Sequence, residues 1–377
     1  MAAMSYSPTE SPRQLIDQVR AAASARRSLR IIGGDTKAFY GQPVAGEPVS
    51  TSGWAGIVSH EPSELVVTVR AGTPLIELEA ALAEQGQCLP FEPPRFGPAS
   101  TIGGAVAAGL AGPARASAGG VRDYVLGVQF IDGRGEWLTF GGQVMKNVAG
   151  YDVSRVLAGS MGTLGILTDI SLKVLPVAPA EATLVFSLGQ HDALEQLHRW
   201  GGQPLPLNAS CWVKDQTQPD APELLFLRLR GAVAAVESAC ERLSREAGGT
   251  RMDNAETGPD WAACRDQALP FFTAPSADLC LWRLSVPQTA AVISLPFVQL
   301  IEWHGAQRWL WAPASAATEI RSAAAAVNGH ATLFRAGVDG APGVPRFDRQ
   351  TAVIDTITQR LRAEFDPAGI FNPGRMG

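Results

Sequence analysis

The sequence contains few cysteines and histidines, and neither type is clustered. Its five cysteines, Cys88, Cys211, Cys240, Cys264 and Cys280, include no CxxC pair. An odd number at wide spacing excludes a disulfide framework and an iron–sulfur or zinc ligand set on this chain. The five histidines form no HxH, HxxxH or HExxH pattern, so we expect no metal site.

Positive charge and long apolar runs are also scarce. The formal net charge is -5 and charged residues make up 18% of the 377 residues, which argues against nucleic acid as a main partner. No apolar run reaches about 18 residues, so we expect no membrane-spanning helix. The N-terminal residues lack a charged segment followed by an apolar one, so no secretory signal is predicted. We expect a cytoplasmic protein.

Apolar residues and glycine are abundant. Hydrophobic residues make up 46% of the chain, which suits a folded protein with a large interior. The length suits about two domains. Three glycine-rich segments precede Pro176-Val177-Ala178-Pro179, and none follows it. We therefore expect a first domain over 1–178, a second over 179–345, and a C-terminal helix and tail, 346–377, that packs back on the first domain.

Local patterns predict an α+β fold. Ser11 as N-cap, with Pro12 at the first helical position, predicts a helix that runs toward Arg26. The turn Asp132-Gly133-Arg134-Gly135 between two apolar segments predicts a β-hairpin. After residue 179, strands and helices alternate in a way that predicts two successive β-α-β-β-α-β units. Such units form an antiparallel sheet with helices on one face.

The first glycine-rich segment, Gly33-Gly34-Asp35-Thr36-Lys37, follows a predicted strand. Glycines allow backbone N–H groups to converge on an anion, whereas bulky side chains would block that approach. The alternative is an ordinary turn at the end of a strand.

The second segment runs from Pro98 to Gly112. Each glycine inside a helix costs about 1 kcal/mol relative to alanine, yet Ile102, Val106 and Leu110 recur at helical spacing. The pattern fits either a backbone that lies against a flat or charged ligand or close helix packing in a core.

The third segment, Gly159 to Gly165, lies between a predicted helix and a buried strand. It differs from the GxGxxG fingerprint, which opens a helix, so a nicotinamide-binding fold is disfavoured. A large ligand with a pyrophosphate could contact all three segments.

These segments resemble a known family. IIGGDTK, PASTIGGAVAAGLAG, KNVAGYD (146–152) and GSMGTLGIL are similar to the FAD-binding domain of the vanillyl-alcohol-oxidase type, also called PCMH-type. Within that group, the stretches 92–127 and 141–152 resemble the FAD-binding subunits of glycolate oxidases. The tail DPAGIFNPGRM and the segments 269–272 and 329–332 are similar as well.

The resemblance implies a PCMH-type FAD-binding domain of two α+β subdomains. It also implies a second α+β lobe, which would have an antiparallel sheet and ferredoxin-like repeats. FAD would lie in the first domain, with the first segment on the pyrophosphate, the second along the diphosphate and ribityl chain, and the third at the adenosine side and flavin edge. The cofactor-binding residues implied are Gly33, Gly34, Asp35, Thr36, Lys37, Pro98, Ser100, Thr101, Ile102, Gly103, Gly104, Gly109, Gly112, Gly159, Ser160, Gly162, Thr163, Gly165 and Ile166.

Two departures from the family pattern bear on the chemistry. Members that attach FAD covalently carry a histidine in the first loop, where this chain has Gly33-Gly34-Asp35, so we expect non-covalent FAD. Catalytic relatives carry a C-terminal pair of metal-held histidines, and this chain has only His330 there. His330 and His304 are the candidate bases for a hydroxyl proton. Arg283, Arg335 and Arg375 are candidate partners, in the second lobe, for a substrate carboxylate.

The resemblance implies a FAD-dependent subunit of a complex that oxidises glycolate or a related 2-hydroxy acid such as D-lactate. The alternative is an accessory flavoprotein that relays electrons or stabilises the complex while a paralogous flavoprotein performs the chemistry. In both cases the expected partners are a second flavoprotein and an iron–sulfur protein. Association with a membrane would be peripheral, at its inner face and through the complex.

Overall fold

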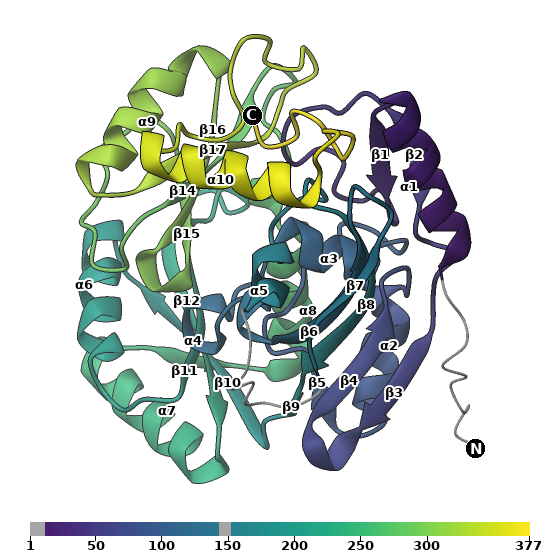
Figure 1. Cartoon of the computed structure of the whole chain (residues 1–377). Helices are drawn as coiled ribbons and strands as arrows, with labels where there is room; N and C mark the ends of the chain where they lie inside the picture. Colours follow the sequence, from purple (N-terminus) through teal and green to yellow (C-terminus); the bar gives the residue numbers. More distant parts are fainter. Residues whose placement is uncertain (1–11, 143–151) are drawn as a thin grey trace. The chain divides into compact units, whose positions relative to one another are not determined.

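The computed structural model describes residues 12–142 and 152–377, in two compact units (Figure 1). Unit 1 comprises Met1–Leu110, Gly120–Val177 and Arg349–Gly377, and unit 2 comprises Ala111–Gly119 and Ala178–Asp348. The short segment 111–119 therefore belongs to the second unit, although it lies inside the first domain expected from the sequence. Ser11 and most of the KNVAGYD segment fall outside the described residues.

The first part of unit 1 is built around a parallel strand pair. Strand β1 (Leu29–Ile32) pairs with β2 (Glu47–Ser50), and helix α1 (Arg13–Ala25) packs its apolar side against them. Helix α10 (Ala352–Phe365) leads into the C-terminal tail, which lies on the other side of β1. The Leu29 N–H donates to the Ile370 carbonyl and the Asn372 N–H donates to the Leu29 carbonyl. The last residues of the chain thus extend its first sheet.

The second part of unit 1 is an antiparallel sheet in the order β3-β4-β8-β6-β7. The predicted hairpin is confirmed, because β6 pairs with β7 and the Asp132 carboxylate accepts from the N–H groups of Arg134 and Glu136. Its strands are β3 (Ile57–Glu61), β4 (Val66–Arg70), β6 (Val125–Ile131), β7 (Trp137–Gly141) and β8 (Ile166–Lys173). This part also contains helices α2 (Leu75–Ala83), α3 (Ile102–Ala108) and α5 (Val153–Leu157). A short strand pair, β5 (Gln87–Cys88) and β9 (Leu175–Pro176), completes it.

Unit 2 is a single eight-stranded sheet in the order β13-β10-β12-β11-β15-β16-β14-β17, antiparallel at every pairing. Helices α6, α7 and α9 pack on one face of it (Figure 1). The elements are β10 (Ala180–Ser187), α6 (Gln190–Gly201), β11 (Leu207–Lys214), β12 (Glu223–Gly231), α7 (Val233–Ala247), β13 (Thr250–Met252), α8 (Asn254–Asp266), β14 (Cys280–Ser285), β15 (Gln299–Glu302), β16 (Gln307–Ala312), α9 (Ala317–Ala326) and β17 (His330–Arg335).

The two predicted repeats differ from each other. The first follows the β-α-β-β-α-β order, but the second has no helix between β14 and β15 in this part of the described chain. Pro287 and Pro296 flank that stretch and disfavour a continuous helix. The buried Arg308 guanidinium instead donates to the carbonyls of Ala290 and Ala291. Side-chain bonds thus satisfy backbone groups that a helix would have paired.

Unit 2 holds the segment 111–119 through two neighbouring residues. The Trp303 indole N–H donates to the Gly112 carbonyl at 3.0 Å, and the Arg115 guanidinium lies over the Trp303 ring. His304 Nε2 lies 2.9 Å from Ser117 Oγ. These contacts explain why a glycine-rich stretch that continues from α3 is grouped with the second unit. None of the described helices is both long and apolar enough to cross a lipid bilayer.

Candidate functional site

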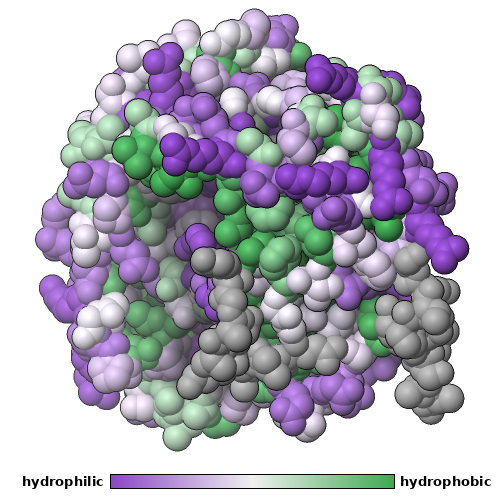
Figure 2. All heavy atoms as spheres, in the orientation of Figure 1, coloured by the Kyte–Doolittle hydropathy of each residue, from purple (hydrophilic) through white to green (hydrophobic). Residues whose placement is uncertain are grey.

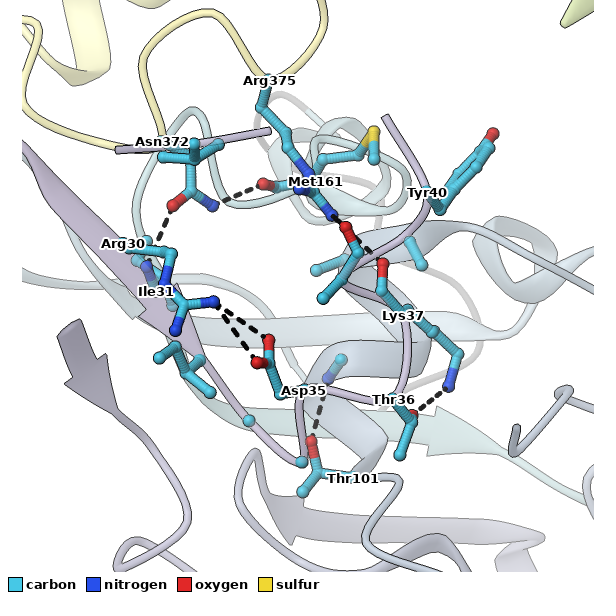
Figure 3. A pocket seen from close by; sticks show the side chains of 18 of the residues that line it. Arg30, Ile31, Asp35, Thr36, Lys37, Tyr40, Thr101, Met161, Asn372 and Arg375 are labelled. Carbon is cyan, nitrogen blue, oxygen red and sulfur yellow. Dashed lines mark hydrogen bonds and ion pairs between the residues drawn. The ribbon is translucent and has the colours of Figure 1, made fainter. Parts of the chain in front are cut away.

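A cavity of about 110 Å³ opens in unit 1 where the loop after β1 meets the start of α3 (Figure 3). Met161 and two tail residues, Asn372 and Arg375, complete its wall. Of the residues that the sequence assigned to the cofactor, those that line the cavity are Gly33, Gly34, Asp35, Thr36, Lys37, Ser100, Thr101 and Gly104. Residues that sequence reasoning did not assign to a site also line it, among them Arg30, Ile31, Tyr40, Ala107, Ala108, Met161 and Asn372.

The loop after β1 presents backbone donors. Within the described residues, the N–H groups of Gly34, Asp35 and Thr36 donate to no carbonyl or side-chain acceptor. Asp35 is in the left-handed region at φ 54°, which turns the chain sharply. A Cβ on Gly34 would lie 1.5 Å from the Ala99 carbonyl oxygen, so glycine is required for the approach of the two loops. Successive N–H groups in such a turn form an anion-binding concavity.

The charge around the cavity is positive. Three cationic side chains, Arg30, Lys37 and Arg375, face one carboxylate, Asp35. Arg30 pairs with Asp35 at 3.3 Å, and both side chains are partly exposed, so this pair contributes little to stability. Lys37 Nζ donates to Ser100 Oγ at 2.7 Å, which holds its ammonium group at the junction of the two loops. The cavity is thus suited to an anion.

Helix α3 divides its two glycines between different tasks. Thr101 is the N-cap and accepts a hydrogen bond from the Gly104 N–H. A Cβ on Gly103 would lie 2.7 Å from both Cβ and O of Ala71, so Gly103 allows close packing. A Cβ on Gly104 would meet only Thr101 Oγ1, at 3.3 Å. Close packing therefore accounts for Gly103, whereas Gly104 lines the cavity.

The C-terminal tail ties the parts of the site together. The Asn372 side chain accepts from the Ile31 N–H and donates to the Met161 carbonyl, at 2.9 and 2.8 Å. It therefore links β1, the third glycine-rich segment and the tail (Figure 3). Arg375 was expected in the second lobe, but it lies in unit 1. Its guanidinium donates to the carbonyls of Lys37, Ala38 and Gln42, so it holds the loop after β1 in place.

The other predicted cofactor residues are not part of the lining of this cavity. Gly109 ends α3 in the left-handed region and packs against Gly159, and Gly162 packs against the Asn372 side chain. Thr163 Oγ1 donates to the Ser160 carbonyl. Gly112 is grouped with unit 2. Those absent from the cavity lining are Pro98, Ile102, Gly103, Gly109, Gly112, Gly159, Ser160, Gly162, Thr163, Gly165 and Ile166.

Comparison with known proteins identifies the family. A family model described as "FAD binding domain" matches residues 8–141. Glycolate oxidase subunit GlcE of Escherichia coli (strain K12) is 44% identical over 96% of this chain and 96% of its own length. The chain belongs to the GlcE family of glycolate oxidase subunits.

More distant relatives share parts of the chain or its fold. Glycolate oxidase subunit GlcD of Bacillus subtilis (strain 168) is 33% identical over 37% of this chain and 30% of its own length. A solved structure of alkyldihydroxyacetonephosphate synthase aligns with a TM-score of 0.67 over 96% of this chain and 75% of that protein, at 16% identity. That second likeness shows the fold alone. The predicted α+β fold with a PCMH-type FAD-binding domain is confirmed.

His304, the first candidate base of this GlcE-family chain, is a buried structural residue. It lies in the left-handed region at φ 54°, and its Nδ1 and Nε2 are within 3.1 and 2.9 Å of Ser210 Oγ and Ser117 Oγ. Burial lowers the pKa of His304 from 6.5 to about 4. Its ring is therefore neutral at physiological pH, and both nitrogens already have partners. A base for a hydroxyl proton needs a pKa nearer neutrality.

This burial predicts acid sensitivity. Because the His304 pKa is lower in the folded state, protons favour the unfolded chain, and stability falls as the pH drops from 6.5 toward 4. The loss should reach about 3 kcal/mol. Urea unfolding of His304→Asn at several pH values should show a clearly smaller loss over this range, since asparagine tolerates positive φ and does not titrate. The control is His191→Asn, which replaces an exposed histidine of α6. An effect on the pH dependence as large as that of His304→Asn would contradict burial of His304 as the cause.

The remaining candidates lie at the β17 edge of the unit 2 sheet. His330 is the first residue of β17, and part of its side chain is exposed to solvent. Partial burial of the ring, and then the positive charge of Arg283, lower the pKa of His330. The guanidinium groups of Arg283 and Arg335 lie 5.4 and 6.0 Å from the Phe334 ring centroid. Among the described residues, one group of possible metal ligands comprises His191, Asp192 and Glu195, all exposed on α6. Such exposed acidic groups commonly occur without a metal.

Proposed function

We propose that unit 1 binds FAD non-covalently, with the diphosphate against the N–H groups of Gly34, Asp35 and Thr36. This proposal rests on two observations together. These three backbone N–H groups have no acceptor within the described residues, and cationic side chains line the cavity that they face. At about 110 Å³ the cavity is too small for a whole dinucleotide, so only the diphosphate part is assigned to it. Gly33, Lys37, Ser100, Thr101 and Gly104 would complete the contact.

The sequence of the loop after β1 supports non-covalent binding. Family members that attach FAD covalently carry a histidine in this loop, where the present chain has Gly33-Gly34-Asp35. The GlcE-family assignment gives the reaction class, since the relative is named as a glycolate oxidase subunit. We therefore propose that this chain takes part in oxidising glycolate, or a related 2-hydroxy acid such as D-lactate, to the 2-oxo acid.

Each part of the chain has a definite task in this proposal. When bound, FAD supplies a two-electron acceptor for hydride from the hydroxyl-bearing carbon of the acid. Loop 33–37 and Lys37 neutralise the diphosphate, and Arg375 and Asn372 hold that loop in place. The hydroxyl proton needs a base, and among the described histidines of unit 2 only His330 combines solvent contact with a place on the sheet edge.

One observation favours an accessory role for this subunit. His304, the buried candidate, is neutral and has partners at both ring nitrogens, so His330 is the one remaining candidate of the two predicted bases. In this alternative a paralogous flavoprotein partner oxidises the acid, and the FAD bound by this chain relays electrons or stabilises the complex.

Partner subunits are part of the proposal. All five cysteines are free in the structure, so an iron–sulfur relay would belong to another chain. Helix α10 has no fully buried residue, and Val353, Ile354 and Ile357 are 69%, 48% and 57% exposed. Figure 2 shows hydrophobic and hydrophilic residues side by side on this face. We propose a second flavoprotein and an iron–sulfur protein as partners, and a complex in the cytoplasm or at the inner face of the membrane.

The test of non-covalent binding is direct. Purified protein should be yellow and contain about one FAD per chain. Acid precipitation should release the flavin into the supernatant, identified as FAD by its mass. Flavin that stays with the precipitated protein would show a covalent bond and contradict the proposed mode of binding.

The charge of Lys37 should contribute to FAD affinity. We expect Lys37→Met to weaken FAD binding roughly tenfold, because an ammonium group beside a diphosphate contributes about 1 to 2 kcal/mol in a partly exposed site. The measurement is titration of flavin-free protein with FAD at low and high salt, and the mutant should show a weaker salt dependence. Lys173→Met removes the same charge from β8, outside the cavity lining, and should bind FAD as the wild type does.

A further inference from the structure

Unit 2 contains a second and larger cavity, on the sheet face opposite α6, α7 and α9. Its volume is about 680 Å³, within the range of small-molecule sites. All of its described lining residues belong to unit 2, from β10, β11, β12, α8, β15, β16 and the segments 215–217, 269–279 and 296–298. None of them is among the residues assigned to FAD or to the candidate bases.

The walls of this cavity are aromatic. Trp261, Trp311, Phe226, Phe271 and Phe297 all line it. The indole N–H groups are already used by the protein, since Trp261 donates to Thr183 Oγ1 at 3.0 Å and Trp311 donates to the Phe271 carbonyl at 2.7 Å. These two residues therefore offer ring surface to a ligand, with no free donor. Ring surfaces favour a flat partner, which stacks or packs edge to face.

The polar groups of the cavity do not suit a 2-hydroxy acid. Lys214 is the only cationic residue among the described lining residues, and it is exposed. The buried Cys264 thiol donates to the Glu302 carboxylate, which also accepts from Gln307 and Trp309. An anionic acid would need a cationic or multiply donating pocket to replace its water. The aromatic enclosure would also be far too large for so small a molecule.

We propose that this cavity binds a planar, largely apolar aromatic molecule with a polar end directed toward Lys214 and solvent. The cavity shares no lining residue with those assigned to FAD or with the candidate bases, so the proposal does not depend on the proposed function. Partly exposed aromatic side chains around a cavity of this size are otherwise a liability for a folded protein, because they leave apolar surface in water.

The test uses N-phenyl-1-naphthylamine, a neutral aromatic probe that fluoresces in apolar surroundings, with the FAD-loaded full chain. We expect saturable binding near micromolar Kd. Val298→Arg and Thr273→Arg should each weaken it about tenfold or more, since both residues line the cavity and are exposed, so the fold should tolerate arginine there. Val338→Arg is the matched control, because Val338 is 77% exposed and does not line the cavity.

Several results would overturn the proposal. These are the absence of saturable binding, equal affinity in Val298→Arg and wild type, and a loss in Val338→Arg as large as in the cavity variants. Displacement of the probe by millimolar glycolate would show that the cavity is the acid site. Unchanged flavin content and unfolding temperature in all three variants are expected and exclude a general loss of structure.

Discussion

Gly104→Val should give a folded protein without FAD. Only Thr101 Oγ1 lies near the position of a new Cβ, at 3.3 Å, and a small movement of that hydroxyl relieves the contact. The remaining methyl groups would enter the cavity, where the diphosphate is proposed to lie. We expect flavin content to fall at least tenfold, while the unfolding temperature stays within a few degrees of flavin-free wild type, because valine in a helix costs no more than glycine.

Two further glycine variants make this prediction specific. Gly103→Val should lose soluble protein altogether, since its Cβ would lie 2.7 Å from Ala71, where backbone cannot move aside. Gly53→Val should retain FAD, because no atom lies within 4 Å of the place that a Cβ would take there and its φ is not restricted to glycine. If soluble Gly104→Val retains a full complement of flavin, the diphosphate lies elsewhere.

The isolated subunit should be reduced by glycolate far more slowly than the assembled complex turns over. Positioned general bases contribute roughly 100- to 10,000-fold to such reactions, and His304 cannot serve as one at its pKa of about 4. Anaerobic mixing of the FAD-loaded chain with glycolate, followed at the flavin absorption band, measures the rate. Reduction by dithionite is the control that shows the bound flavin to be redox-competent.

Rapid bleaching by glycolate, at the turnover rate of the complex, would place a complete catalytic site in this chain and contradict the accessory alternative. His330→Gln would then be the first variant to examine, followed by Arg283→Met and Arg335→Met. A base variant should lower kcat and shift the pH profile, whereas loss of a carboxylate partner should raise KM. Arg375→Met should instead reduce FAD retention, since Arg375 holds the loop at Lys37 and Ala38.

The amino-acid sequence was sufficient to predict the fold class, the hairpin at 132–135 and the nature of the ligand in unit 1. The hairpin follows from local turn chemistry, because its turn residues are adjacent in the chain. The fold class and the FAD ligand follow from the resemblance of the glycine-rich segments to the PCMH-type family, since each segment alone also fits an ordinary turn or close packing. The spacing of the cysteines also predicts that this chain carries no metal cluster on cysteine, because the ligand spacing of such clusters is local. The helix order of the first repeat in unit 2 was predictable, and Pro287 and Pro296 are a local signal against a helix in the second. The pairing of Arg308 with the carbonyls of Ala290 and Ala291 could be seen only in the structure.

Tertiary contacts were needed to distinguish the glycine of α3 that lines the cavity from the glycine that packs against Ala71. Gly103 and Gly104 are equivalent in sequence, and the position of Ala71 on one side of α3 distinguishes them. Asn372 and Arg375 reach the site from the far end of the chain, so no local pattern could place them there. The pKa of His304 likewise depends on burial by distant segments. Long-range contacts set these properties, because packing and desolvation act between residues that the sequence keeps apart.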